Sequence, residues 1–248
     1  MKFIEVKNYQ QMSETAAEYI MKKVLDNPSI TLGLATGGTP TGTYQNLIKD
    51  HQKNGTSYQH VTTFNLDEYI GLAGTDKNSY RYYMDENLFN HIDIKKANTF
   101  VPKGNGRNIE EECNRYEDLL AGHGGIDLQV LGIGSNGHIG FNEPGTSFQS
   151  KTHIVNLAPS TIEANARFFN RPEEVPTQAI TMGISTIMKS KEILLLVSGE
   201  SKRDAMYQLL HSELNENFPA SVLKNHPCVT IIADEAAILD LKIPMLKE

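Results

Sequence analysis

Short apolar runs alternate with amphipathic segments along most of the chain. The runs are rich in branched side chains, as buried strands of a parallel sheet are, and the segments between them repeat apolar residues at helical spacing. Strands are expected at residues 3–6, 30–35, 61–66, 128–133, 152–157, 179–182, 192–198 and 228–233. Helices are expected at 9–25, 44–48, 79–89, 109–120 and 184–188, with another opening at 198–202. This alternation predicts an α/β fold with a doubly wound, mainly parallel sheet and helices on both faces.

One stretch breaks the alternation. Residues 158–177 contain three prolines and mixed charges, which favours a mobile cover over a core element. Elsewhere no linker, internal repeat or low-complexity run is visible, and 248 residues are enough to bury a large core. We therefore expect a single domain over 1–248.

Composition excludes several classes of protein. Thirty acidic against 23 basic residues give a net charge of -7, and no Lys/Arg cluster offers a surface for nucleic acid or an anionic membrane. No segment is apolar enough to span a bilayer, and the first residues do not resemble a secretory signal. Cys113 and Cys228 stand in unrelated contexts, which argues against a disulfide framework or a zinc cluster. A reducing cytoplasm fits best.

The segment 130–145 holds the densest candidate chemistry. Its glycines form G-x-G-x-x-G after a predicted strand, but Pro144 breaks any helix that a dinucleotide site would need. The fold is therefore expected to be Rossmann-like without binding a dinucleotide. What remains is a polar loop with Asn136, His138 and Glu143. A lone histidine is commonly structural, but this grouping after a strand favours a catalytic site.

A second glycine turn follows the predicted strand 30–35. Gly37, Gly38 and Thr39 precede a helix, so backbone N–H groups at its positive end can receive a phosphate. No G-K-[ST] follows, so the turn is not a nucleotide P-loop. The alternative is that the glycines only turn the chain.

Charged side chains near other strand ends complete the candidates. Asp67 follows the run 61–66, where it could act as a general base or cap a turn. The neighbouring Glu68 points to the opposite face of a strand, so the two carboxylates should not share one role. Lys202 stands near a strand-to-helix turn and could reach a phosphate, whereas Arg167 alone reads as an exposed ion-pair residue.

Five separated motifs together resemble the glucosamine-6-phosphate deaminase family. They are LATGGTPTGTY from 34, TFNLDEYIGL from 63, GIGSNGHIGFNEPG from 132, ANARFF from 164 and SGESKR from 198. The resemblance covers the chain from about residue 3 to about 241. It implies conversion of glucosamine 6-phosphate and water to fructose 6-phosphate and ammonia, without a metal or redox cofactor.

The resemblance also assigns roles to the candidates. His138 would help open the sugar ring, held in orientation by Glu143 and Asn136, and Asp67 would move a proton from carbon 2 to carbon 1. The phosphate would rest on the N–H groups of Gly37, Gly38 and Thr39 with Lys202 and Arg167 beside it. Arg167 falls in the segment that resembles the family's lid.

Two departures from the family pattern bear on activity and regulation. Many relatives carry an aspartate where this chain has Asn136, so His138 should depend mainly on Glu143. Hexameric relatives use basic residues at an effector site where this chain has His153 and Val155, and they have a longer tail. We therefore expect a monomer or small homo-oligomer without activation by an amino-sugar phosphate.

Two other functions remain open on the sequence. A 6-phosphogluconolactonase shares the general fold, but its reaction needs no base for a carbon-bound proton. The carboxylates after 61–66 would supply such a base, so they favour the deaminase. A non-catalytic sugar-phosphate sensor would carry a DNA-binding segment before the effector domain. Here the residues ahead of the strand 30–35 and its phosphate turn leave room for only one strand and one helix.

Overall fold

Seven parallel strands form the central sheet of the computed structural model, which describes residues 1–166, 169 and 171–241. Their order across the sheet is β1 (Lys2–Val6), β10 (Val229–Asp234), β9 (Glu192–Val197), β6 (Leu128–Leu131), β2 (Thr31–Leu34), β3 (Thr62–Asn65) and β5 (Thr99–Phe100). After β2, the strands β3 and β5 are added toward one edge of the sheet. After β6, the strands β9 and β10 are added toward the other edge. The doubly wound sheet is thus confirmed, with its switch point between β2 and β6.

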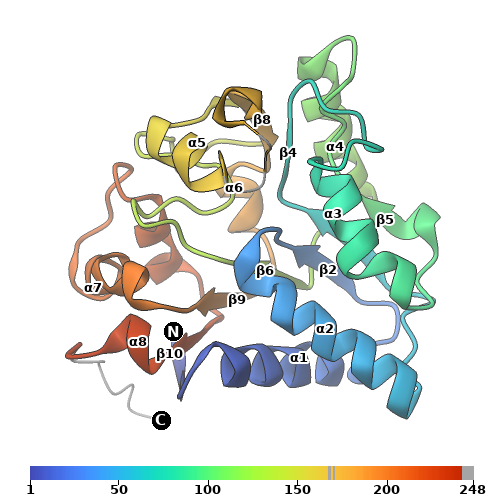
Figure 1. Cartoon of the computed structure of the whole chain (residues 1–248), viewed down its shortest axis with the longest axis horizontal. Coiled ribbons are helices and arrows are strands. Elements are labelled where there is room, and N and C mark those ends of the chain that lie inside the picture. The colour runs from blue at the N-terminus through green and yellow to red at the C-terminus, as the bar shows by residue number, and fades with distance from the viewer. Residues whose placement is uncertain (167–168, 170, 242–248) are drawn as a thin grey trace.

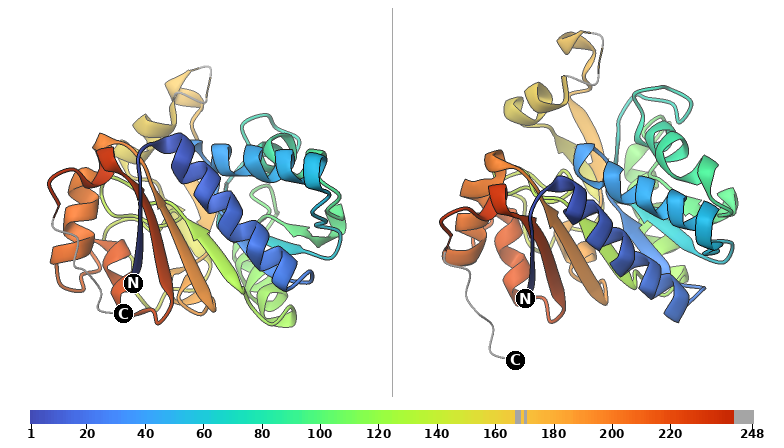
Figure 2. Two further views of the ribbon diagram at one scale, coloured as in Figure 1. Left: turned by 90° about the horizontal axis from the view of Figure 1, so that it is seen from below. Right: turned by 60° about the horizontal axis from the view of Figure 1, so that its bottom comes forward.

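Helices cover both faces of this sheet (Figures 1 and 2). One face packs against α1 (Tyr9–Asp26), α2 (Gly38–Asn54) and α3 (Tyr80–Asn87). The other packs against α4 (Ile109–Gly122), α6 (Ile184–Ile187), α7 (Arg203–His211) and α8 (Glu235–Ile238). Within β9, Leu194 and Leu196 join the first core while Ile193 and Leu195 join the second. Burial on both faces explains why the strands are continuous apolar runs.

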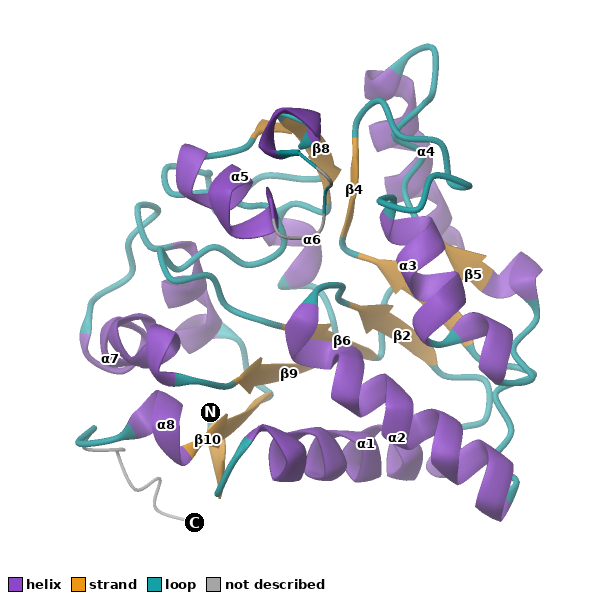
Figure 3. Ribbon diagram, in the orientation of Figure 1, coloured by secondary structure: helices purple, strands orange, loops and turns teal. Residues whose placement is uncertain are grey.

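A second sheet is antiparallel and was not expected from the sequence. It has the order β4 (Asp67–Tyr69), β8 (Gln178–Thr181) and β7 (His153–Asn156), and Figure 3 shows β4 and β8 apart from the large sheet. The runs at 152–157 and 179–182 are therefore strands, as predicted, but they belong to this sheet. An apolar run predicts a strand and not the direction of its partner.

Leu66 joins the two sheets. Its N–H donates to the carbonyl of Leu34 in the large sheet at 3.2 Å, and its carbonyl accepts from Met182 N–H at 2.6 Å, just beyond β8. Asp67 therefore begins where the chain passes from one sheet to the other.

The stretch expected to be a mobile cover contains regular structure. Helix α5 (Pro159–Ala166) begins at a proline, and a 3₁₀ turn follows at Pro172–Glu174. Proline is well suited to the first position of a helix, where its missing N–H costs nothing, so Pro159 begins α5 rather than breaking it. A lid role for this segment stays a prediction.

Shorter features complete the described part of the chain. Further 3₁₀ turns lie at Phe89–His91, Lys96–Asn98, Glu200–Lys202 and Pro219–Asn225. Cys113 and Cys228 are free thiols. None of the helices described here has the length and apolar character needed to cross a bilayer.

Candidate active site

Four loops that follow neighbouring strands line one cavity. Gly37 follows β2, Asp67 follows β3, His138 follows β6 and Lys202 follows β9. These strands are adjacent in the order β9-β6-β2-β3 and all parallel, so their carboxyl ends meet at one edge of the sheet. The cavity lies at the switch point, where open α/β sheets bind ligands.

The glycine turn forms one wall of the cavity. Gly37 has a φ of 91°, a left-handed conformation that glycine adopts without strain, and α2 begins at the next residue. No side chain caps the start of α2, while Tyr83 Oη donates to the carbonyl of Gly37 at 2.7 Å. Gly38 and Thr39 also line the cavity. The turn therefore has the geometry of an anion site at a helix N-terminus.

His138 and Glu143 face each other beside the cavity. The Nδ1 atom of His138 lies 3.6 Å from Glu143 Oε2, and the imidazole packs on the backbone of Gly134. A Cβ added at Gly134 would lie 2.4 Å from ring atoms of His138. Only glycine fits there, so this glycine permits the close approach of the imidazole.

Asn136 acts on Glu143 and on the backbone. Its Nδ2 donates to Glu143 Oε2 at 2.9 Å, and its Oδ1 accepts from the backbone N–H of His138 at 3.2 Å. The sequence led us to expect Asn136 to orient the imidazole of His138. In the structure its side chain holds the partner of the imidazole and the loop that carries it.

Glu143 is shared between the catalytic loop and α5. Its Oε1 accepts from Thr161 Oγ1 at 2.5 Å and from the backbone of Ala158 at 3.4 Å. Burial by itself raises the pKa of Glu143, but the contacts with His138, Thr161 and Asn136 outweigh it and hold the pKa to about 2. Glu143 is thus a carboxylate at neutral pH and faces the imidazole of His138 with a negative charge.

Asp67 lies deep in the cavity wall, with only 6% of its surface exposed. Burial, and after it the charge of Glu68, raise the pKa of Asp67 to about 8. Glu68 points away from the cavity and accepts backbone N–H groups, as strand alternation predicts. A carboxyl group with a pKa near neutrality is suited to take up and return a proton.

The two predicted cations have different outcomes. Lys202 lines the cavity beside the glycine turn. Arg167 lies outside the described residues, so its phosphate-binding role stays a prediction. Within the described residues, no group of three His, Cys, Asp or Glu side chains could hold a metal ion.

Sequence reasoning missed the residues that reach the site from other segments. Thr161 lies in the stretch expected to be mobile, and Tyr80 and Phe141 line the cavity and stack on each other. The sequence contains one local signal here: Ser79 is a typical N-cap residue and marks the start of α3 just before Tyr80. Nothing local indicated that α3 borders the site.

Comparisons with known proteins show which family the chain resembles. Residues 6–231 match the model of a family described as glucosamine-6-phosphate isomerases/6-phosphogluconolactonase. A protein of Halalkalibacterium halodurans named glucosamine-6-phosphate deaminase is 62% identical over 96% of this chain and 97% of its own length. A solved structure of a monomeric glucosamine-6-phosphate deaminase has a TM-score of 0.95 at 50% identity, covering 98% of this chain and 100% of the other. A solved 6-phosphogluconolactonase from Trypanosoma cruzi has a TM-score of 0.80 at 18% identity, covering 98% and 97%, which is a likeness of fold alone.

Proposed function

Because the chain belongs to the family of glucosamine-6-phosphate isomerases and 6-phosphogluconolactonases, we infer that it deaminates glucosamine 6-phosphate in amino-sugar catabolism. The reaction consumes water and yields fructose 6-phosphate and ammonia. The observation that carries this function is the placement of Asp67 and His138 on one cavity with the glycine turn at 37–38. A proton-transfer group, an imidazole and a phosphate seat are what the reaction requires.

The chemistry follows from the two acid–base groups. His138 takes the proton of the anomeric hydroxyl and delivers it to the ring oxygen as the ring carbon–oxygen bond breaks, and Glu143 stabilises the imidazolium that exists between the two transfers. Asp67, as a carboxylate, removes the proton from carbon 2 of the open aldehyde while oxygen 1 takes up a proton from solvent, which gives an enolamine. Asp67 then returns its proton to carbon 1 and the nitrogen releases one to solvent, which leaves an imine at carbon 2. Water adds to that imine, the carbon–nitrogen bond breaks, and ammonia leaves.

The glycine turn and Lys202 hold the other end of the sugar. Backbone N–H groups of Gly37, Gly38 and Thr39 bind the phosphate at the positive end of α2, and Lys202 adds a charge-assisted contact. Arg167 would supply a second cation from the segment 158–177, which would close as a lid over the sugar. We further propose that the protein is a single domain and a monomer. A monomer is supported by the solved deaminase of that kind.

Lactone hydrolysis is the second candidate, because the family description includes it. Hydrolysis of an ester needs an activated water and no base for a proton on carbon. The buried Asp67 favours the deaminase.

Product release from glucosamine 6-phosphate tests the proposal. Fructose 6-phosphate and ammonia should appear in equal amounts, with and without a chelator, and both should be nearly lost in Asp67→Asn. Hydrolysis of 6-phosphogluconolactone by a folded chain that leaves glucosamine 6-phosphate untouched would select the lactonase.

A further inference from the structure

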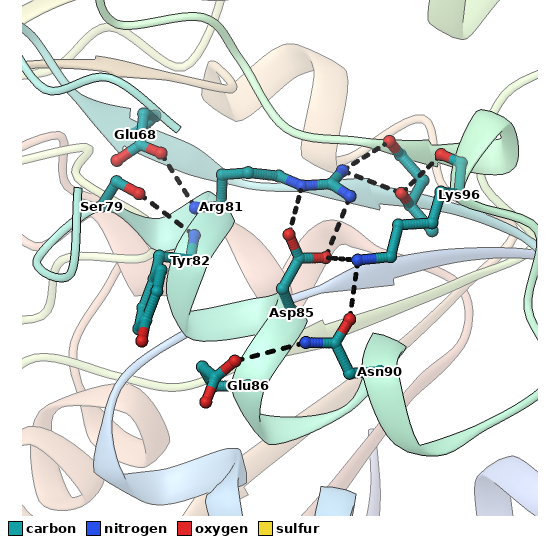
Figure 4. Close-up of polar contacts among 9 residues, drawn as sticks. Glu68, Ser79, Arg81, Tyr82, Asp85, Glu86, Asn90 and Lys96 are labelled. Carbon is teal, nitrogen blue, oxygen red and sulfur yellow. Dashed lines mark hydrogen bonds and ion pairs between the residues drawn. The ribbon is translucent and has the colours of Figure 1, made fainter. Parts of the chain in front are cut away.

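Glu68 is a buried carboxylate that the mechanism above does not use. It follows Asp67 on β4, points to the opposite face and is 2% exposed. Its Oε1 accepts the backbone N–H groups of Tyr69 at 2.9 Å and Tyr80 at 2.8 Å, and its Oε2 accepts that of Arg81 at 2.9 Å. Tyr80 and Arg81 open α3, so one carboxylate clamps that helix to the strand that carries Asp67 (Figure 4).

Contacts of two further residues, Ser79 and Arg81, stabilise the same end of α3. Ser79 accepts from the N–H of Tyr82 at 3.1 Å as an ordinary N-cap. The Arg81 guanidinium donates to the carbonyl of Thr99 at 3.1 Å and to its hydroxyl at 2.8 Å, and it pairs with Asp85, as Figure 4 shows. These contacts stabilise α3 without involving Glu68 or Asp67. A variant that removes one of them therefore tests the stability of the helix separately from the contact made by Glu68.

Helix α3 supports both ends of the cavity. Tyr80 lines the wall near Asp67, and Tyr83 donates to the carbonyl of Gly37 in the phosphate turn. A movement of α3 relative to β4 therefore changes the separation between the proton-transfer group and the phosphate seat.

Glu68 also dominates the charges close to Asp67. Burial is the first cause of the raised pKa of Asp67 and the Glu68 charge is the second. The pKa of Glu68 itself is raised to about 7, because burial outweighs its three N–H partners. Among the described residues, the other titratable groups around the two carboxylates are Tyr69, Tyr80 and Tyr116 near Asp67, Asp76 and Arg81 near Glu68, Lys103 and Arg115 on the cavity that Glu68 lines, and His138 and Lys202 on the cavity that Asp67 lines.

We propose that Glu68 is a positioning residue of the deamination, which fixes α3 on β4 and so sets the place of Asp67 relative to the phosphate turn. Its charge acts on Asp67 from the neighbouring position of the strand. The proposal rests on the function inferred above. It assigns Glu68 no contact with the substrate.

Three variants separate charge from structure. Glu68→Gln removes the charge and places an amide donor against the N–H of Arg81. Glu68→Asp keeps the charge but shortens the side chain. Ser79→Ala removes a cap from the same helix end and leaves both carboxylates in place. The measurement is kcat/KM against pH for fructose 6-phosphate release, together with Tm.

The low-pH limb of kcat/KM reports the free enzyme's base, and the amine of the substrate is the same for every variant. We expect Glu68→Gln to move this limb to lower pH by about 1 unit, the effect of removing one nearby charge. Glu68→Asp should keep the wild-type limb with kcat lowered about tenfold, since the clamp is displaced. Ser79→Ala should lower Tm and leave the limb in place.

Each failure points to a different cause. A wild-type chain that releases no fructose 6-phosphate would remove the proposed function itself. A wild-type chain that turns over, while Glu68→Gln keeps its limb or Ser79→Ala moves it equally, would overturn the role of Glu68 and leave the deaminase standing.

Discussion

The hydroxyl of Thr161 donates a hydrogen bond of 2.5 Å to Oε1 of Glu143, while Oε2 of the same carboxylate lies 3.6 Å from Nδ1 of His138. One carboxylate thus joins α5, which lines the cavity, to the imidazole of His138. The orientation of His138 depends on where α5 lies.

Replacement of Thr161 tests this connection. Thr161→Val keeps the shape but leaves Oε1 of Glu143 with one weak partner, which should raise the pKa of Glu143 and destabilise the protein by about 1–3 kcal/mol. We expect kcat to fall about tenfold, because the imidazole loses a fixed partner. Thr161→Ser restores the hydroxyl and should recover most of both losses. Equal kcat for Thr161→Val and wild type would show that α5 does not act through Glu143.

Asp67 should make the protein less stable as the pH rises. Its pKa is raised from 3.8 to about 8 by folding, so the folded state retains a proton that the unfolded chain has lost. The penalty is absent below about pH 4, grows up to about pH 8 and then stays constant. Asp67→Asn carries no such penalty and should gain about 4 kcal/mol on the wild type between about pH 5 and about pH 9, while activity is lost.

Urea unfolding of both proteins across that range measures the difference. The pKa of Glu68 is raised to about 7, so this second carboxyl group titrates in the middle of the range. The comparison is therefore most direct at the two ends of the range. A constant difference at all pH values would contradict a buried, protonated Asp67.

Gly134 is expected to tolerate no side chain. Gly134→Ala places a methyl group where the ring of His138 now lies, and a displacement of about 1 Å can cost about 100-fold in rate. Gly122→Ala, at the end of α4, has no atom within 4 Å of the new methyl group and serves as the folding control. Full activity of Gly134→Ala would show that the observed imidazole position is not the catalytic one.

Lys202 is expected to act on the phosphate rather than on the reacting carbons. Lys202→Met should raise KM for glucosamine 6-phosphate and the inhibition constant for inorganic phosphate, both about 10-fold or more, with a smaller change in kcat. Lys189→Met removes the same charge at an exposed site outside the cavity and should change neither. If the two variants weaken phosphate inhibition equally, the general charge of the surface is responsible.

The kinetics should be hyperbolic and insensitive to N-acetylglucosamine 6-phosphate. Val155 lies on β7 and packs against the buried cluster of Tyr69, Phe141, Leu157 and Ala179, so it offers no contact for an anion. Initial rates with and without that amino-sugar phosphate, with light scattering for mass, check both expectations. Sigmoidal rates that the effector removes would contradict them.

The sequence predicted the inner strands of the large sheet well because they are buried on both faces, but it missed the short edge strand β5 (Thr99–Phe100). The run expected at 192–198 became β9 (Glu192–Val197), with every residue after the first buried. The run expected at 179–182 looked the same and formed β8 in the antiparallel sheet. Strand direction depends on which chain segment lies alongside, and that information is absent from a local pattern.

The candidate site was predictable to the extent that its residues follow strands. Gly37, Asp67 and His138 each stand just after an apolar run, and parallel strands bring such positions to one edge. Thr161 and Tyr83 could not be found in this way. They reach Glu143 and Gly37 from 18 and 46 residues away, through contacts that only the folded chain creates.

The hydrogen bonds of Leu66 fix the number of residues between β3 and β4. With its N–H bonded into the large sheet and its carbonyl bonded beside the small one, no slack remains between Asn65 and Asp67. Side chains alternate along a strand, so one residue inserted or deleted here would exchange the places of Asp67 and Glu68. The cavity would then receive the longer carboxylate, and α3 would lose its clamp. Loops elsewhere can change length during evolution, but this junction can vary only by substitution.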